Sequence, residues 1–195
     1  MTNKLTLLGN YPDMVFRVFT EREHAQQFID GDIRFGNIHY YKKIECAKRR
    51  DNTEGESHIV YEGVSKHGMF ATNSIYILCC HKSLASVEKC KLGSHVVKIA
   101  DPKAFAKDIT SALEESRDKY FGGIEGCCVE YSKGMVASAS LSGYEIVRLA
   151  YCQKPLNFSH EDEFRFVAIS KDSAGDFLSI QLNEPMKYCK IINGI

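Results

Sequence analysis

Hydrophobic and polar positions alternate along several short stretches of the chain, which is typical of β-strands whose side chains point to opposite faces of a sheet. Residues 14–19, with sequence MVFRVF, add the aromatic and β-branched side chains that favour strands. Thr20 follows, with Glu23 three residues later, a capping-box pattern that predicts a helix ending near Gly31. Residues 32–35 predict the next strand. The chain is therefore expected to open as strand, helix, strand.

A longer helical pattern lies near the middle of the chain. Asp101 precedes Pro102, as expected for an N-cap followed by proline at the first helical position. Phe105, Ile109 and Leu113 then recur every four residues, which predicts a helix with one apolar face, running to about residue 120.

The other patterned stretches predict strands, at residues 69–80, 95–99, 126–131, 144–151, 164–169, 177–182 and 186–192. Helices fall early and strands dominate late, without regular alternation of the two. This order predicts an α+β fold with a mixed, largely antiparallel sheet rather than a doubly wound fold. The 195 residues fit a single domain spanning 1–195.

A charged stretch without clear periodicity, residues 42–57, interrupts these elements and reads as a long loop. It contains Arg49, Arg50 and Asp51, which can bind phosphate or a nucleic-acid target. Long loops inside compact domains are often functional, but such a run is equally consistent with a solvated excursion, and both interpretations stay open.

The overall charge balance argues against two classes of protein. Lys and Arg together number 25, equal to the 25 Asp and Glu, so neither a nucleic-acid coat protein nor a membrane-surface binder is indicated. No apolar run approaches the roughly 20 residues of a membrane span, and the first residues lack a secretory pattern. A cytoplasmic protein without membrane partners is expected.

The eight cysteines do not show the spacing of a zinc site. Two pairs are adjacent, Cys79 with Cys80 and Cys127 with Cys128, so their side chains would point to opposite faces of a strand. We interpret the cysteines as small buried hydrophobic residues, and no metal ligands are predicted. The common phosphate-loop, dinucleotide-binding, esterase and zinc-protease motifs do not occur in the sequence either.

The stretch HEDEFRF, residues 160–166, places three carboxylates side by side, directly before a predicted strand. Like charges this close repel one another unless a cation, a helix terminus or a ligand compensates them. The stretch is therefore either a solvated turn or a site. Alternation along the strand would put Glu163 and Arg165 on one face, and Phe164 and Phe166 on the other.

Glu161 and Glu163 complete a set that also contains Arg17 in the first strand, and Thr72 and Ser74 near a middle strand. In this chain order the set resembles the ADP-ribosyltransferase superfamily, whose members carry an Arg, a Ser-Thr-Ser element and a late Glu-x-Glu. The middle element departs from that pattern, because the sequence there is FATNS. The segments RFGNIHYYKKIE and EDEFR are also similar to an uncharacterised group of prokaryotic proteins associated with defence and toxin genes.

The resemblance implies an ADP-ribosyltransferase-like fold, NAD as substrate and a role for each residue. Glu163 would stabilise the oxocarbenium charge that develops on the ribose, and Arg17 would bind the cofactor phosphates. Ser74 or Thr72 would orient the catalytic carboxylate, and Glu161 would face the acceptor of the ADP-ribosyl group.

Three further side chains are candidates beside this set. Tyr40 and Tyr41 can stack on nicotinamide or a base, although paired aromatic residues are also common in cores. His160 can act as a general base, although a solvated loop histidine is the simpler interpretation.

These observations lead to three functional hypotheses. The first is an NAD-dependent ADP-ribosyltransferase or NAD-cleaving enzyme, acting as an intracellular toxin or antiphage effector with a protein or nucleic-acid acceptor and a cognate antitoxin or defence partner. The second is a non-catalytic module that binds protein or nucleic acid through residues 42–57. The third is a nuclease that holds magnesium through the oxygen ligands Asp51, Glu54, Glu161 and Glu163.

Overall fold

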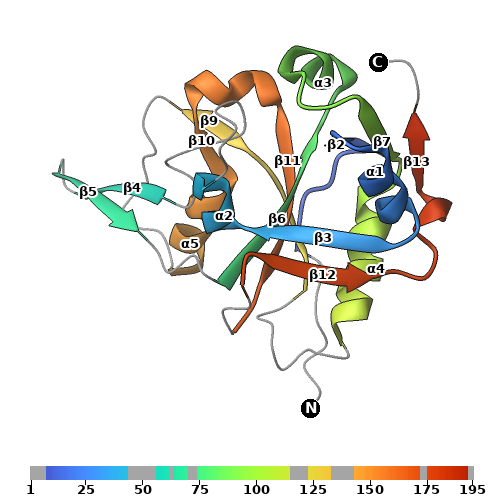
Figure 1. Ribbon diagram of the computed structural model, residues 1–195. Helices are drawn as coiled ribbons and strands as arrows, with labels where there is room; N and C mark the ends of the chain where they lie inside the picture. Colours follow the sequence, from blue (N-terminus) through green and yellow to red (C-terminus); the bar gives the residue numbers. More distant parts are fainter. Residues whose placement is uncertain are drawn as a thin grey trace.

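A nine-stranded sheet organises the chain in the computed structural model, which describes residues 8–43, 56–61, 64–69, 74–114, 123–132, 143–171 and 175–192. Its strands are β1 (Leu8–Gly9), β2 (Val15–Phe19), β3 (Asp32–Asn37), β6 (Ile75–His81), β7 (His95–Ile99), β8 (Glu125–Cys128), β11 (Glu163–Ile169), β12 (Phe177–Gln181) and β13 (Cys189–Ile192). Seven of them follow the order β1-β8-β11-β6-β2-β7-β13, and β3 joins β6 to β12 (Figure 1). The sheet is antiparallel except where β1 meets β8, so the α+β class with a mostly antiparallel sheet is confirmed.

The opening of the chain is the predicted strand, helix and strand, with α1 (Arg22–Ile29) between β2 and β3. The predicted capping box was wrong, because the helix begins two residues after Thr20 and its N-cap, Glu21, makes no side-chain capping bond. Gly31 ends this helix region with a φ of 103°, in the left-handed region that favours glycine.

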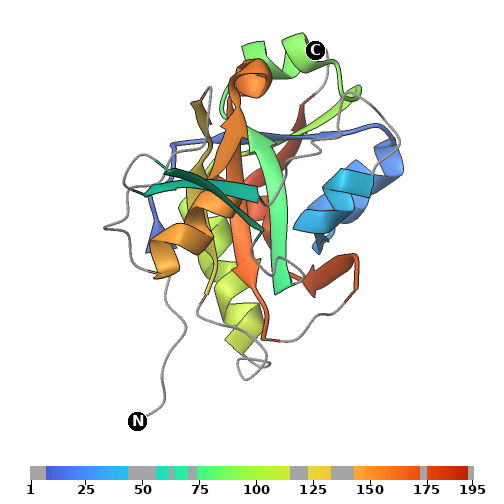
Figure 2. The ribbon, with the colours of Figure 1, turned by 90° about the vertical axis from the view of Figure 1, so that its left-hand side faces the viewer.

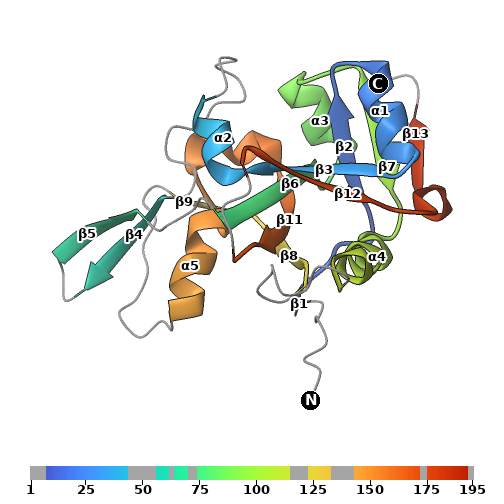
Figure 3. The same cartoon turned by 60° about the horizontal axis from the view of Figure 1, so that its bottom comes forward.

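The other helices are α2 (Ile38–Lys43), α3 (Leu84–Cys90), α4 (Pro102–Glu114), α5 (Gly143–Cys152) and the 3-10 turns η3 (Leu156–Glu161) and η4 (Pro185–Lys187). The α4 N-cap is as predicted, since the Ala104 amide donates to Asp101 Oδ1 at 2.9 Å. Two small sheets stand apart from the main one, β9 (Glu130–Ser132) with β10 (Gln153–Pro155) and β4 (Glu56–Tyr61) with β5 (Val64–Met69). The β4–β5 hairpin projects from the rest of the molecule (Figure 3). None of the helices in the described ranges has the length and apolar character needed to cross a bilayer.

The predicted strand at residues 144–151 is instead the helix α5. Its apolar side chains fit a helix, because Val147 and Tyr151, four residues apart, pack into the same cluster against Ile77 and Val167. The predicted strand at 186–192 is likewise shorter, since η4 occupies its first residues and β13 its last.

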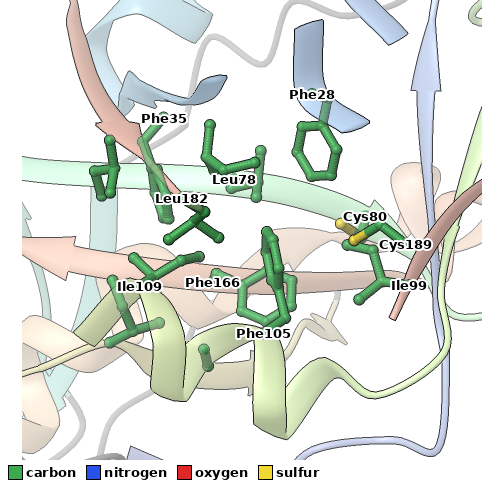
Figure 4. Close-up of a cluster of buried hydrophobic side chains, with 14 of the residues drawn as sticks. Phe28, Phe35, Leu78, Cys80, Ile99, Phe105, Ile109, Phe166, Leu182 and Cys189 are labelled. Carbon is green, nitrogen blue, oxygen red and sulfur yellow. The ribbon is translucent and has the colours of Figure 1, made fainter. Parts of the chain in front are cut away.

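The main hydrophobic core fills the space between α4 and one face of the sheet (Figure 4). Phe105 of α4 meets Phe166 of β11 edge to face, with 5.1 Å between ring centroids. Phe164 and Ala168 belong to the same cluster as Phe166, whereas Val167 faces the second cluster under α5. The alternation predicted for β11 is therefore confirmed, and it sends Glu163 and Arg165 to the face opposite the main core.

The sheet is interrupted along the edge of β6 that faces away from β11. One edge of β6 pairs with β11 over its whole length, and these two strands lie side by side at the centre of the molecule (Figure 2). On the other edge, β3 pairs with β6 at Tyr76 and Ile77, and β2 pairs with it only at His81. Between these contacts, residues 78–80 have no strand partner on that edge in the described part of the chain. β2 and β3 thus diverge from β6 and leave a fork in the sheet.

Candidate functional site

A cavity of about 400 Å³ occupies this fork. Its walls come from the diverging strands β2 and β3, from the unpaired part of β6, and from α1, α2 and η3. A volume of this size lies within the range of roughly 300–1,000 Å³ typical of small-molecule and cofactor sites. The fork therefore provides a space for a ligand where a continuous sheet would have been closed.

Five residues selected from the sequence line this one cavity, namely Arg17, Tyr40, Tyr41, Glu161 and Glu163. They come from opposite ends of the chain. The register of the sheet brings them together, because β11 places Glu163 beside His81, and β2 meets β6 at that same residue.

Two buried cations compensate the crowded carboxylates. Lys154 Nζ lies 2.7 Å from Glu161 Oε2 and 2.9 Å from Glu163 Oε2. Arg165, fully buried, donates from Nε to Glu163 Oε1 at 2.9 Å and from Nη2 to Oε2 at 3.3 Å. Asp162, between the two glutamates, has a φ of 44° and instead pairs with Lys82 at 2.8 Å. The stretch is thus a built cluster of paired charges rather than a solvated turn.

The two glutamates differ in protonation behaviour. Burial would raise the pKa of Glu163, but the charges of Arg165 and Lys154 outweigh it and hold that pKa below its ordinary value. Burial raises the pKa of Glu161 in spite of Lys154, and the neighbouring charge of Glu163 raises it further. Carboxyl groups whose pKa values are pushed apart suit different roles, Glu163 as a fixed anion and Glu161 as a proton acceptor. Glu161 is buried, at the end of η3.

Arg17 reaches across the fork and has no carboxylate partner among the described residues. Its Nη1 donates to the Cys79 carbonyl at 2.5 Å, on the edge of β6 that lacks a strand partner. Its Nε is buried and makes no hydrogen bond within the described part of the chain. A guanidinium placed in a cavity without a counter-ion is suited to an anionic ligand.

His81 is a cavity residue that the sequence did not indicate. Its Nδ1 lies 2.7 Å from the carbonyl oxygen of Glu161, which can only accept, so Nδ1 carries the proton and Nε2 does not. Burial lowers the pKa of His81, which keeps the ring neutral near pH 7.

Cys79 occupies the position expected of a residue that orients the carboxylate. It lines the cavity and lies opposite Arg165 in the sheet, and its side chain contributes to lowering the pKa of Glu163. Burial raises the pKa of this thiol well above its usual value, so it stays protonated and can donate to the carboxylate.

The structure does not bring Ser74 close to Glu163, whose carboxylate it was predicted to orient. Ser74 precedes β6, and its carbonyl accepts from the Ser170 amide just beyond the far end of β11. Because Glu163 pairs with His81 at the opposite end of β6, about 20 Å of strand separates it from Ser74. Thr72, the alternative, lies outside the described residues.

Aromatic side chains form another part of the cavity wall. Tyr40 packs edge to face on Phe177 with 4.6 Å between centroids, and Tyr41 lies 6.0 Å from Tyr40. The Arg34 guanidinium carbon lies 3.6 Å from the centroid of Phe177. All four line the cavity, which therefore joins an aromatic wall to a charged one.

Several other sequence candidates lie elsewhere. His160 is exposed and donates from Nδ1 to the Asn157 carbonyl at 3.0 Å, away from the main cavity. Arg49, Arg50, Asp51 and Glu54 fall outside the described residues. Within the ranges that the structure describes, no group of three or more His, Cys, Asp or Glu residues is arranged to hold a metal ion. Of the eight cysteines, all seven in these ranges are free thiols.

Lys154 is a member of the charge cluster that the sequence did not indicate, and Arg165 was placed beside Glu163 without being given a role. Arg165 had a signal, because its position two residues after Glu163 on a strand puts both side chains on one face. No feature of the sequence indicates Lys154, because its contacts with Glu161 and Glu163 depend on how β10 and η3 fold back toward β11.

Comparison with known proteins gives no relative from which a function can be transferred. No protein-family model, no curated protein and no solved structure matches the chain. The function must therefore be argued from the cavity itself.

Proposed function

We propose that the cavity binds NAD and that the protein cleaves the bond between nicotinamide and ribose, as an ADP-ribosyltransferase or an NAD-cleaving enzyme. The observation that carries this proposal is that Arg17 and Glu163 line the same cavity together with Tyr40 and Tyr41. A phosphate-binding cation, a carboxylate and aromatic rings are the three groups that such a substrate requires.

Arg17 is the group for the phosphates. Lys154 and Arg165 both have carboxylate partners, whereas Arg17 has none in the described part of the chain. Its guanidinium can form forked hydrogen bonds with a phosphate, which the ammonium of lysine cannot reproduce.

The aromatic side chains of the cavity would bind a flat ring of the substrate. Tyr40, Tyr41 and Phe177 provide ring surface inside the cavity, and the Arg34 guanidinium lies over the Phe177 ring. Nicotinamide or adenine would gain stacking contacts there.

Glu163 is the group for the reaction. Loss of nicotinamide leaves positive charge on the ribose, and a carboxylate that stays ionised stabilises this charge as it develops. Lys154 contacts both glutamates, so a ribose hydroxyl can replace its contact with Glu163 while Glu161 still holds the ammonium. Cys79 would keep the Glu163 carboxylate oriented during that exchange.

The resemblance of the segments around Tyr40 and Glu163 to proteins of prokaryotic defence and toxin genes supports a setting for this activity. In that setting the protein would act inside the cell as a toxin or antiphage effector, with a macromolecular acceptor and a cognate partner that restrains it.

Nicotinamide release from NAD tests the proposal, measured with the purified protein alone and with cell extract as a source of acceptors. Glu163→Gln should abolish turnover. Arg17→Lys should raise KM, because lysine keeps the charge but cannot form forked hydrogen bonds with a phosphate. Glu184→Gln, an exposed acidic position outside the cavity, is the matched control and should retain full turnover. Circular dichroism checks that each variant is folded. Wild-type protein that releases no nicotinamide under either condition overturns the proposal.

A further inference from the structure

A second cavity, of about 390 Å³, lies on the other side of Glu161. It is bounded by the end of α3 with the residues that follow, and by η3, which pack against each other. Glu161 and Leu92 line both cavities and so form part of the wall between them. A group bound in the second cavity would therefore approach the site proposed for the ribose from the Glu161 side.

The second cavity carries uncompensated positive charge. Lys89 and Lys91 are exposed at its rim, and neither has an ion-pair partner among the residues that the structure describes. The carboxylate that lines this cavity, Glu161, is already engaged by Lys154, and the adjacent Asp162 is engaged by Lys82. An anionic ligand would meet attraction here rather than repulsion.

Three other side chains give this cavity the means to hold a base. Phe158 is half-buried and offers a ring for stacking, with Lys154 Nζ 5.2 Å from the ring centroid. Asn157 is exposed and offers an amide, which can both donate to and accept from the edge of a base. His160 adds an imidazole whose Nδ1 is already engaged by the Asn157 carbonyl.

We propose that this second cavity binds a single-stranded nucleic acid, whose base is the acceptor of the ADP-ribosyl group. The lysines would contact the phosphates, and Phe158 would stack on a base that is free to leave its neighbours, as in a single strand. An acidic peptide would use the lysines but would leave the aromatic ring without a role. This inference rests on the proposed function, because the acceptor needs a donor in the first cavity.

The chemical step balances without a further reactant. The bond between ribose C1′ and the nicotinamide nitrogen breaks, and its electron pair leaves with nicotinamide. A nucleophilic nitrogen or oxygen of the base forms the new bond to C1′ and loses one proton. Glu161, in the wall between the cavities, first moves away from Lys154. Its carboxylate then accepts the proton that the base loses and passes it to solvent.

Binding is tested first, without NAD, by fluorescence anisotropy of a labelled single-stranded oligonucleotide of mixed sequence, as DNA and as RNA. Lys89→Glu/Lys91→Glu should weaken binding at least tenfold and lower the salt slope by about 1.4, since each phosphate contact on a single strand contributes about 0.7. Phe158→Ala should weaken binding about tenfold through lost stacking. Lys103→Glu/Lys107→Glu, two exposed positions on α4, is the matched control and should bind as wild type does.

Transfer is tested next, by the mass of the oligonucleotide after incubation with the full chain and NAD. An increase by one ADP-ribosyl group that Lys89→Glu/Lys91→Glu removes, while nicotinamide release in the absence of acceptor persists, supports the acceptor site, because both lysines line only the second cavity. Nicotinamide release without oligonucleotide binding overturns this inference and leaves the proposed function standing. Oligonucleotide binding without any nicotinamide release overturns the acceptor role together with the proposed function. Labelling of an acidic protein in preference to the oligonucleotide also overturns it.

Discussion

At the scale of single residues, Arg165 determines what the crowded carboxylates can do. Its guanidinium is fully buried, so Glu163 must remain charged to compensate it, and Lys154 then joins the second carboxylate to the cluster. Removing one partner of a buried ion pair is more costly than removing an exposed one, because the remaining charge keeps its desolvation penalty. The cluster thus fixes the position and charge of Glu163 at the cavity wall.

The charge of Glu163 should make its contribution to stability depend on pH. The folded pKa of Glu163 lies below the unfolded value of about 4.5, because Arg165 and Lys154 outweigh the effect of burial. Its stabilisation is therefore fully present above that unfolded value, and is lost as the pH falls toward the folded pKa. Glu161 shifts in the opposite direction, so the comparison is best made in a Glu161→Gln background.

Urea denaturation of Glu161→Gln and of Glu161→Gln/Glu163→Gln, from pH 3 to pH 7, measures this dependence. At neutral pH the second substitution should lower the free energy of unfolding by about 3 kcal/mol, as expected when a buried ion pair loses one partner. The difference should stay constant down to about pH 5 and shrink below it. A difference that is unchanged at pH 3 would show that Glu163 is not held ionised.

The sequence identified half of this cluster and missed the rest for a physical reason. Glu163 and Arg165 share a strand, so local alternation reveals them as neighbours. Lys154 and Cys79 reach Glu163 from other elements, and only the register of β6 with β11 selects Cys79 rather than Ser74. Residue type alone favours Ser74 as the orienting residue, whereas the pairing of β6 with β11 brings Cys79 near Glu163.

At the scale of elements, α5 shows how a strand-like composition can form a helix. Its apolar and β-branched residues fit either structure, and short stretches of this kind are ambiguous by periodicity. The polar positions resolve the ambiguity, because Tyr144, Arg148 and Tyr151 are spaced by four and three residues and all bind Glu125. That partner lies in β8, so the sequence of α5 alone does not reveal it.

The hydrogen bonds that Tyr151 and Tyr144 donate to Glu125 should differ in strength. Tyr151 is fully buried and donates to Glu125 Oε2 at 2.6 Å, whereas Tyr144 is 48% exposed and donates to the same oxygen at 2.7 Å. Tyr151→Phe should lower the free energy of unfolding by about 2 kcal/mol, as expected for a buried bond to a charged group. Tyr144→Phe, the matched control, should cost less than about 1 kcal/mol because water replaces the lost donor.

Chemical denaturation of the two variants, under the same conditions as wild type, measures the difference. Equal costs would mean that the burial of Tyr151 adds nothing to the anchoring of α5. A larger cost for Tyr144→Phe would contradict the arrangement of the helix on β8.

At the scale of the whole molecule, the site exists because β2 and β3 leave β6 at different points. Most strands of the main sheet were predictable from local patterns, and their antiparallel character followed from the absence of regular strand–helix alternation. The fork was not predictable, since it depends on a single pairing of Phe16 with His81 and on the pairing of Gly36 with Ile77. These contacts join segments that are far apart in the sequence, so the local pattern of hydrophobic and polar residues does not reveal them.

A ligand in the fork should therefore stabilise the whole molecule. The residues around it come from β2, β3, β6 and the segments near β11, so a bound ligand joins parts of the sheet that otherwise meet at few points. ADP-ribose at one hundred times its Kd should add about 2.7 kcal/mol to the free energy of unfolding, if it binds only the folded chain. For a chain of 195 residues this corresponds to a rise in Tm of about 5 °C or more.

Differential scanning fluorimetry with increasing ADP-ribose measures this shift. Arg17→Met should keep most of the unliganded Tm, because Arg17 has no carboxylate partner to lose in the described part of the chain, but it should abolish the shift. Arg22→Met, at an exposed arginine of α1 outside the cavity, is the matched control and should shift as wild type does. A shift of the same size in Arg17→Met would place the ligand away from the fork, and its absence in wild type would contradict binding of the ADP-ribosyl group altogether.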